Sequence, residues 1–356
     1  MNLNNNQTKN IFNNMYKLGS SYSEISKDTG IPKSTIGDFL SKNTYGTWWR
    51  SFDGEPKVGI SPPLNVNIDD PESPVDPSVD YISVATTKDV PDGCNHFVIP
   101  DTQCKGGIDK DYLTWVGKYI VDRKPSVIVH LGDHADMPSL SSYDKGRRTA
   151  EGRRVSEDID AAIEGMNLLL KPLQDLQLEE LRRYGYIKYR PKMVLTLGNH
   201  EGRITRHVDA NPELHGFLSI DDLKYKEMGW EVYDFLEPVI VNGVTYCHYM
   251  ANPMTGKPYG GMAANILKHV GESFTVGHKQ TLEVTTRFLP ASGKQQWGII
   301  AGSCYTHDED YKGYQGNHHW RGVIVKHCVE GGSYNPMFVD LDFLERRFGF
   351  DPDINF

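Results

Sequence analysis

Three short apolar runs in the middle of the chain each end in polar residues that can bind metal ions. The runs are HFVIP, SVIVHLG and KMVLTLG, and each is typical of a buried strand. The polar residues that follow them are Asp101 and Gln103, Asp133 and Asp136, and Asn199 and His200. Because the ends of neighbouring strands converge in space, the sequence predicts that these side chains share one site.

The segments between and after these runs indicate an α/β fold. Helical periodicity occurs near residues 109–122 and 155–183, and a kink is expected in the second segment at Pro172. The pair Asn242-Gly243 between two apolar runs predicts a tight hairpin. Further strands are predicted in SFTVGH, EVTTRF, QWGIIAG and GVIVKHC. We therefore expect a central pair of sheets that is covered by helices.

Two single histidines follow later strands, His248 in TYCHYM and His278 in TVGHKQ. The motifs DTQ, GDHAD, GNHE, CHY and GHKQ thus occur in this order over about residues 95–285. The series resembles the motif set of the calcineurin-like metallophosphoesterases, which is DxH, GDxxD, GNHE, H and GHxH. The resemblance implies a four-layer αββα sandwich and hydrolysis of a phosphoester by metal-activated water.

The same resemblance implies two divalent metal ions. Asp133 would bridge them, since a shared carboxylate can hold two cations about 3.5–4 Å apart. Asn199, His248 and His278 would complete one ion site. Asp101 would belong to the other.

The second ion site departs from the family pattern at both of its histidines. Gln103 stands in place of the histidine of DxH, and Gln280 in place of the last histidine of GHxH. A glutamine oxygen is a hard neutral donor, which predicts a preference for Mn²⁺ or Mg²⁺ over Zn²⁺. The alternatives are a weak site that the substrate completes, and a protein that uses one ion or none.

Two further residues receive roles from the resemblance. His200 in GNHE would face the leaving group and donate a proton or stabilise the transition state. Asp136 would orient a neighbour such as His200 through a hydrogen bond. His134, between the two aspartates, is expected to pack outside the site, with a ligand role as the alternative.

Basic and aromatic residues near these motifs are candidates for substrate contacts. Arg203 and Arg206 follow GNHE closely and could hold a phosphate, because guanidinium groups bind phosphate with paired hydrogen bonds. Four more arginines precede the long helix and could do the same or form a solvated surface: Arg147, Arg148, Arg153 and Arg154. Residues 304–322 could stack aromatic rings on bases or form a packed loop.

Residues 1–50 predict a small all-α domain. Apolar residues recur at helical spacing, and two short helices hinge at Gly30, which resembles the helix-turn-helix of DNA-binding regulators. The residues expected to face DNA are Lys33, Ser34, Thr35 and Lys42. The alternative is a three-helix bundle for protein contact or oligomerisation.

Residues 51–80 hold six prolines and one basic against seven acidic residues, which predicts an extended acidic linker. It would separate the helix-turn-helix domain from a metallophosphoesterase domain over 81–356. The first 50 residues have a net charge of +3, while residues 81–356 carry −6. The catalytic body is therefore not expected to be coated for nucleic acid.

No apolar run reaches the roughly 18–20 residues of a membrane span, and the Asn-rich start MNLNNNQTKN does not resemble a signal peptide. A cytoplasmic protein without a membrane partner is predicted. The five cysteines are odd in number and form no CxxC pair, so buried reduced thiols are expected.

The helix-turn-helix favours a phosphodiester in DNA as the substrate, cleaved by a nuclease or a DNA-associated phosphodiesterase. Such a compact fusion resembles phage-encoded members of the family. The alternatives are a phosphatase or phosphodiesterase for a nucleotide or a phosphoprotein, and a catalytically inert DNA-binding protein.

Overall fold

The computed structural model describes residues 81–349, apart from 143–145, 147–150 and 310–311. The predicted helix-turn-helix and linker, with Lys33, Ser34, Thr35 and Lys42, lie outside the described residues. The chain divides into two units, which are Met1–Ile60 with Gln177–Lys188 and Ser61–Leu176 with Tyr189–Phe356. The description below concerns the second unit.

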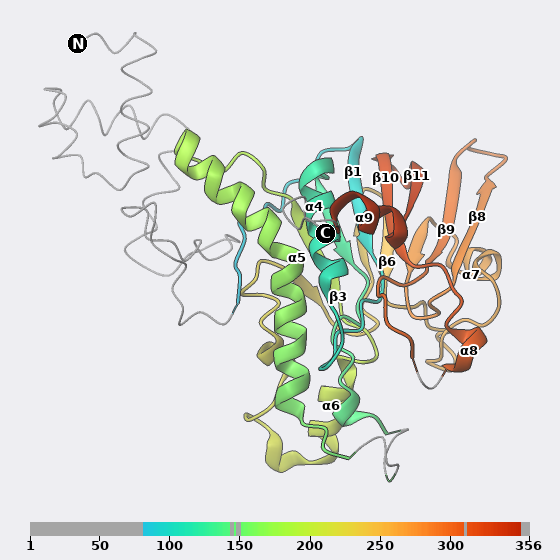
Figure 1. Ribbon diagram of the computed structural model, residues 1–356. Coiled ribbons are helices and arrows are strands. Elements are labelled where there is room, and N and C mark those ends of the chain that lie inside the picture. The colour runs from blue at the N-terminus through green and yellow to red at the C-terminus, as the bar shows by residue number, and fades with distance from the viewer. Residues whose placement is uncertain (1–80, 143–145, 147–150, 310–311, 350–356) are drawn as a thin grey trace, which may run out of the picture. The chain divides into compact units, whose positions relative to one another are not determined.

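A mixed sheet of six strands forms one half of this unit (Figure 1). Its order is β11-β10-β1-β2-β3-β4. Strands β1 to β4 run parallel, while β10 is antiparallel to β1 and β11 is antiparallel to β10. The bounds are β1 (Cys94–Ile99), β2 (Val127–His130), β3 (Lys192–Thr196), β4 (Glu231–Tyr233), β10 (Gly322–Glu330) and β11 (Ser333–Asp340).

The central strands are apolar on both faces because both faces are buried. In β1, Phe97 and Ile99 belong to one core and Val98 to another. Strand β2 divides in the same way, with Ile128 in the first core and Val129 in the second. The continuous apolar runs of the sequence are the expected pattern for parallel strands that are covered on both sides.

A second mixed sheet has five strands in the order β5-β6-β7-β9-β8. Its bounds are β5 (Val239–Val241), β6 (Val244–Cys247), β7 (Phe274–Val276), β8 (Leu282–Phe288) and β9 (Gln295–Ala301). The predicted hairpin is confirmed, since β5 and β6 pair antiparallel around Asn242 and Gly243, whose φ angles are +46° and +79°. Two positive φ angles are those of a type I′ turn.

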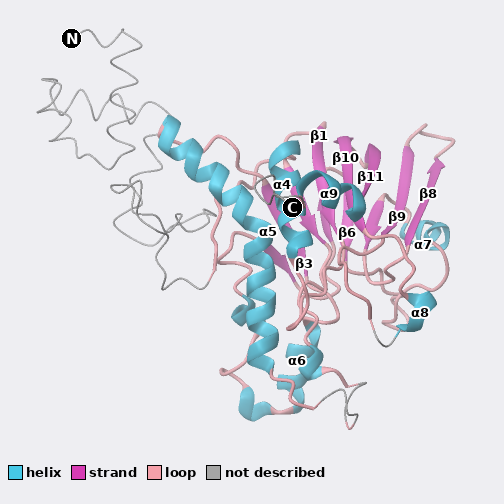
Figure 2. Ribbon diagram, viewed as in Figure 1, coloured by secondary structure: helices cyan, strands magenta, loops and turns pink. Residues whose placement is uncertain are grey.

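Helices cover the sheets, as Figure 2 shows by colour. Residues of α4, α5 and α9 share one core with the six-stranded sheet, whereas α7 packs on β7 and β9 of the five-stranded sheet. A further core joins the two sheets. The bounds are α4 (Asp111–Arg123), α5 (Val155–Tyr184), α6 (Gly202–Ala210), α7 (Ala263–Val270), α8 (Gly313–Gly316) and α9 (Leu341–Phe348), with short 3₁₀ helices at Pro138–Leu140, Pro212–Leu214 and Ile220–Leu223.

Helix α5 runs through Pro172, so this proline does not end it. Gly117 of α4 lies against the same stretch of α5. A Cβ atom at Gly117 would stand 2.3 Å from the carbonyl oxygen of Leu169 and 3.0 Å from the Pro172 ring. The close approach of the two helices therefore requires glycine at this position.

The expectation for the cysteines holds for four of the five. All five are free thiols, and Cys94, Cys104, Cys247 and Cys304 are buried. Cys328 is exposed, which corrects the prediction, because it lies in β10 where the register shifts between His327 and Glu330. Within the described residues, no helix combines the length and apolar character that a membrane span requires.

Candidate metal centre

The polar residues that follow β1, β2 and β3 meet at one edge of the six-stranded sheet. Adjacent parallel strands end at the same edge, so the geometry follows from the strand order. The backbone N–H of His200 donates to Asp133 Oδ1 at 2.8 Å. The backbone N–H of His278, after β7 of the other sheet, donates to Asp101 Oδ1 at 3.1 Å. The edges of the two sheets thus supply one site.

Glu201 ties the loops after β2 and β3 together. Its buried carboxylate accepts hydrogen bonds from the backbone N–H groups of Asp133, Ala135 and Gly198, each at 2.9 Å. A Cβ atom at Gly198 would come within 2.1 Å of Asp133 Oδ1, so glycine lets the loops approach. Glu201 is a residue of the site for which no role was predicted, although a carboxylate directly after GNH was a visible signal.

Four side chains point donor atoms at a common space. The donor atoms of Asp133, His248 and His278 lie within 4.8 Å of one another. Asn199 Oδ1 lies 3.0 Å from His248 Nε2 and 2.7 Å from His278 Nδ1. His248 Nδ1 donates to the carbonyl oxygen of Leu131 at 2.7 Å, which leaves Nε2 to face the cluster. These four donors fit one divalent cation.

The charges in this cluster also suit a cation. Burial raises the pKa of the Asp133 carboxyl, but His200 and His248 outweigh burial and hold that pKa well below its ordinary value. Burial lowers the pKa of His248, but Asp133 and Asp101 raise it to about 9. The Asp133 carboxylate is therefore ionised and attracts positive charge.

The residues predicted for the second ion differ in whether their polar atoms already have partners in the protein. Burial raises the pKa of the Asp101 carboxyl to about 6. Among the described residues, no hydrogen-bond partner faces Asp101 Oδ2 or either amide atom of Gln103, although all three atoms are buried. Buried polar atoms without a protein partner call for a ligand or water. Asp101 and Gln103 are thus suited to bind a polar or cationic ligand.

Gln280, the remaining predicted ligand, already has partners in the protein. Its side-chain oxygen accepts from the hydroxyl of Tyr305 at 2.8 Å and from the ammonium of Lys312. Lys312 also donates to the Tyr305 hydroxyl at 2.8 Å. Tyr305 is fully buried, so it fixes this arrangement. Gln280 therefore does not fit an ion as well as Asp101 and Gln103 do.

His200 and Asp136, the predicted catalytic pair, are in direct contact. His200 Nδ1 lies 2.7 Å from Asp136 Oδ1, and Nε2 lies 3.8 Å from Asp133 Oδ2. Burial lowers the pKa of His200, but Asp133 and Asp136 outweigh it and raise that pKa above its ordinary value. Nε2 also lies 3.1 Å from Arg203 Nη2. His200 is thus oriented by Asp136 and directed at the cluster.

Arg203 is held beside this pair, because its Nη1 donates to the carbonyl oxygen of Asp136 at 2.7 Å. Arg206 donates to the carbonyl oxygen of Asn199 at 2.8 Å and is more exposed. Of the other arginines, Arg153 donates to Pro138 O, and Arg154 is an exposed side chain that faces Glu157. Arg147 and Arg148 lie outside the described residues.

Lys105 is a basic residue of the site that the sequence analysis missed. Its Nζ lies 3.4 Å from Asp136 Oδ2 and donates to Glu309 at 2.8 Å. Glu309 also lies 2.9 Å from His307 Nε2. Lys105 thus links Asp136 to Glu309, which lies 204 positions after Lys105 in the chain. Only the fold brings these residues together, so no local pattern marks Lys105.

His134 and the aromatic loop are packed into the protein. The ring of His134 lies 2.7 Å from Thr102 Oγ1 and 2.9 Å from the carbonyl oxygen of Ala162, away from the cluster. Tyr305 is buried, and the ring of Trp320 makes an edge contact with Phe338. Among the described residues of 304–322, these two rings therefore favour the packed loop over base stacking.

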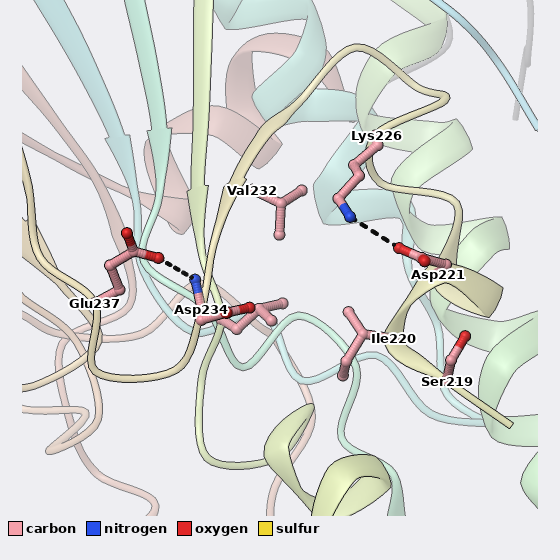
Figure 3. Close-up of a pocket in the computed structure, with 8 residues that line it drawn as sticks. Ser219, Ile220, Asp221, Lys226, Val232, Asp234 and Glu237 are labelled. Atoms are coloured by element: carbon pink, nitrogen blue, oxygen red, sulfur yellow. Dashed lines mark hydrogen bonds and ion pairs between the residues drawn. The ribbon is translucent and has the colours of Figure 1, made fainter. Parts of the chain in front are cut away.

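A hollow of about 420 Å³ lies apart from the cluster and contains none of the candidate ligands (Figure 3). Asp221 and Lys226 form an ion pair of 3.0 Å across part of it. Glu237 accepts from the backbone N–H of Asp234 at 3.1 Å. The polar groups that line this hollow are therefore largely paired with each other.

No family model matches the chain. The Gene 54 protein of Mycobacterium phage L5 is 22% identical to it over 253 residues, a match that covers 68% of this chain and 92% of that protein. The chain is thus similar to a phage protein whose name states no activity.

Proposed function

We propose that the chain is a metal-dependent phosphoesterase that hydrolyses a phosphodiester, with DNA as its substrate. The observation that carries the proposal is the convergence of Asp133, Asn199, His248 and His278 on one space, with His200 directed at it. These residues come from four separate segments and two sheets. A site assembled in this way from metal-binding side chains is a functional candidate rather than a packing feature.

The four donors would hold one divalent ion, with Mn²⁺ or Mg²⁺ as the expected metals. A divalent ion in such a site polarises a phosphoryl oxygen and lowers the pKa of water. The family resemblance adds a second ion beside Asp101 and Gln103, and this second ion remains a prediction. Chelation followed by a count of the Mn²⁺ ions restored per chain would test it.

The neighbouring residues have roles that follow from their positions. His200 would give a proton to the leaving oxygen, and its contact with Asp136 keeps Nε2 turned toward the cluster. Arg203 and Lys105 bring positive charge to the same side, so both could hold a phosphate group. Arg206, which is more exposed, would contact a longer substrate.

The architecture supports the same proposal. Two sheets share a core, and helices pack on the outer face of each, which is the order expected of the four-layer αββα metallophosphoesterase sandwich. The relative in a mycobacteriophage agrees with the resemblance to phage-encoded members.

The decisive experiment is a hydrolysis assay with the purified full chain and Mn²⁺. Bis-p-nitrophenyl phosphate would report on diesters in general, and single-stranded DNA, duplex DNA, RNA, cyclic nucleotides and phosphomonoesters would rank the substrates. We expect diester hydrolysis that EDTA abolishes and a preference for DNA. Absence of metal-dependent hydrolysis on the whole panel would leave an inert DNA-binding protein as the better proposal.

The DNA part of the proposal rests on residues 1–50 and has its own test. Removing them should weaken duplex DNA binding and its salt dependence while hydrolysis of the small diester is unchanged. Substituting Lys33 and Lys42 by alanine in the full chain should have the same effect in smaller measure. Equal affinity before and after truncation would indicate an oligomerisation or protein-contact module.

A further inference from the structure

Lys312 contacts one of the residues that the family resemblance assigns to the second metal ion. It lies within residues 304–322 and donates to Gln280, which occupies the position of a histidine ligand in the family pattern. Burial lowers the pKa of Lys312, while the carboxylates of Glu309 and Asp101 act in the opposite direction. The negative charge of Asp101, another predicted ligand of that ion, thus favours the charged form of Lys312.

Gln280 is not available to a cation while Lys312 is in place. A carbonyl oxygen has two lone pairs. In Gln280 one accepts from Tyr305 and the other from Lys312. A glutamine can accept from a lysine in this way, whereas a histidine that bound a metal ion would have the ammonium as a repelling neighbour. A glutamine at position 280 is therefore compatible with the lysine at position 312.

We propose that the ammonium of Lys312 takes the place of the second metal ion, so that the site uses one divalent ion and one lysine. This inference rests on the proposed phosphoester hydrolysis. The ion would lie among Asp133, Asn199, His248 and His278, and the lysine lies against Gln280.

The donors of Lys312 show what it does for the substrate. An ammonium has three N–H donors. Two are directed to Gln280 and Tyr305, which fix the position of the nitrogen. The third can be donated to a phosphoryl oxygen of the diester. Lys312 then stabilises negative charge that grows on this oxygen in the transition state, as a positioned donor does in other sites of this kind.

Buried polar atoms of the two other residues predicted for that ion agree with this arrangement. Asp101 Oδ2 and the amide of Gln103 are buried and have no partner among the described residues. A phosphodiester carries one negative charge and several acceptor oxygens. The Gln103 amide N–H₂ can donate to one of them, and Asp101 balances the lysine charge.

The first test counts ions in the wild-type full chain. After EDTA treatment and titration with Mn²⁺, we expect one ion per chain and the six-line electron paramagnetic resonance signal of isolated Mn²⁺. Two ions and an exchange-coupled signal in the wild type would overturn the inference while leaving the proposed hydrolysis intact. No bound ion and no hydrolysis would overturn the proposed function itself, and the inference with it.

The second test replaces the lysine. Lys312→Met should lower kcat on bis-p-nitrophenyl phosphate by about 100-fold or more, the scale of losing one positioned donor. It should keep the first ion and gain a second at millimolar Mn²⁺, because Gln280 is released. Lys312→Arg should keep a one-ion signal and recover part of the rate. Lys294→Met is the matched control, since Lys294 is exposed in the turn between β8 and β9.

The variants also distinguish a catalytic from a merely structural lysine. A structural role predicts an equal loss in Lys312→Met and Lys312→Arg, together with a lower unfolding temperature and no change in ion count. That result would overturn the inference. Full activity of folded Lys312→Met with one ion would do the same.

Discussion

Asp133 serves both the loops and the proposed ion through its two carboxylate oxygens. Oδ1 accepts from the backbone of His200, and Oδ2 lies 3.3 Å from His248 Nε2. Asp133→Asn keeps the shape but removes the charge, so Mn²⁺ binding should weaken and turnover fall by about three orders of magnitude. Calorimetric titration and a diester assay measure the two effects. Asp221→Asn, at an exposed aspartate, should change neither.

Substitution of His200 should lower the rate of hydrolysis without loss of Mn²⁺ binding. His200 faces the cluster but is oriented by Asp136 rather than placed among the four donors. His200→Gln should therefore retain one Mn²⁺ per chain and lower kcat by about 100-fold or more, as expected for a general acid. His215→Gln, on an exposed loop, provides the control. A parallel loss of ion and activity would make His200 a ligand.

The sequence identified most residues of the site but not their partners. Asp101, Asp133, Asn199, His248 and His278 could be named because each follows an apolar run. Partners that come from distant segments carry no such signal. The contacts of Glu201, Lys105, Tyr305 and Lys312 could not be predicted because they depend on how loops 25 to 204 residues apart meet in the fold.

At the scale of elements, patterns that depend on burial were the most informative. Strands β1, β2 and β3 and helices α4 and α5 lie close to their predicted places. The apolar residues of the strands line two buried faces, and those of the helices line one. The path of α5 through Pro172 was not decided by the sequence. Helix α5 continues through this proline, and Gly117 of α4 lies against this part of it.

Gly117→Ala should destabilise the protein although alanine favours helices. The added methyl would stand 2.3 Å from a backbone oxygen of α5, which cannot rotate away. Overpacking costs about 1–3 kcal/mol. This exceeds the gain of about 1 kcal/mol for alanine over glycine in a helix. Urea unfolding should show a lower free energy of unfolding, while Lys118→Ala at the next, exposed position should have little effect.

At the scale of the whole molecule, a lysine is buried where the two sheets face each other. Lys326 of β10 is fully buried and donates to Thr275 and Tyr246 of the other sheet. The ring centroids of Tyr246 and Tyr334 each lie 4.5 Å from the Nζ of Lys326. Burial holds the pKa of Lys326 well below its ordinary value. Among the described residues, no carboxylate forms an ion pair with it.

This lysine should make stability depend on pH. Between its folded pKa and about 10.4, the value in the unfolded chain, the unfolded state binds the proton and the folded state does not. The free energy of unfolding should therefore rise with pH across this window. Lys326→Met should flatten the rise and stabilise the protein at pH 7 by about 1–4 kcal/mol, as when other buried ionic groups become apolar. Urea unfolding from pH 7 to 10 measures both, with Lys88→Met as the exposed control.

The proposed ligands lie far apart along the chain and on different sheets. Asp133 and Asn199 follow strands of the six-stranded sheet, whereas His248 and His278 follow strands of the five-stranded sheet. A bound ion would connect the two sheets. At a free ion concentration of 100 times its Kd, binding would add about 2.7 kcal/mol to the free energy of unfolding. Scanning calorimetry should show an unfolding temperature that rises with Mn²⁺ in the wild type and does not respond in Asp133→Asn.

The same separation sets an order of events during synthesis. A ribosome must complete the chain well beyond His278 before the four donors can meet, so the nascent strands β1 to β4 of the six-stranded sheet cannot rely on the ion. Its strands β1 to β3 must first be held by their own apolar cores. The metal would secure the fold only after the second sheet has docked, as the last step of maturation.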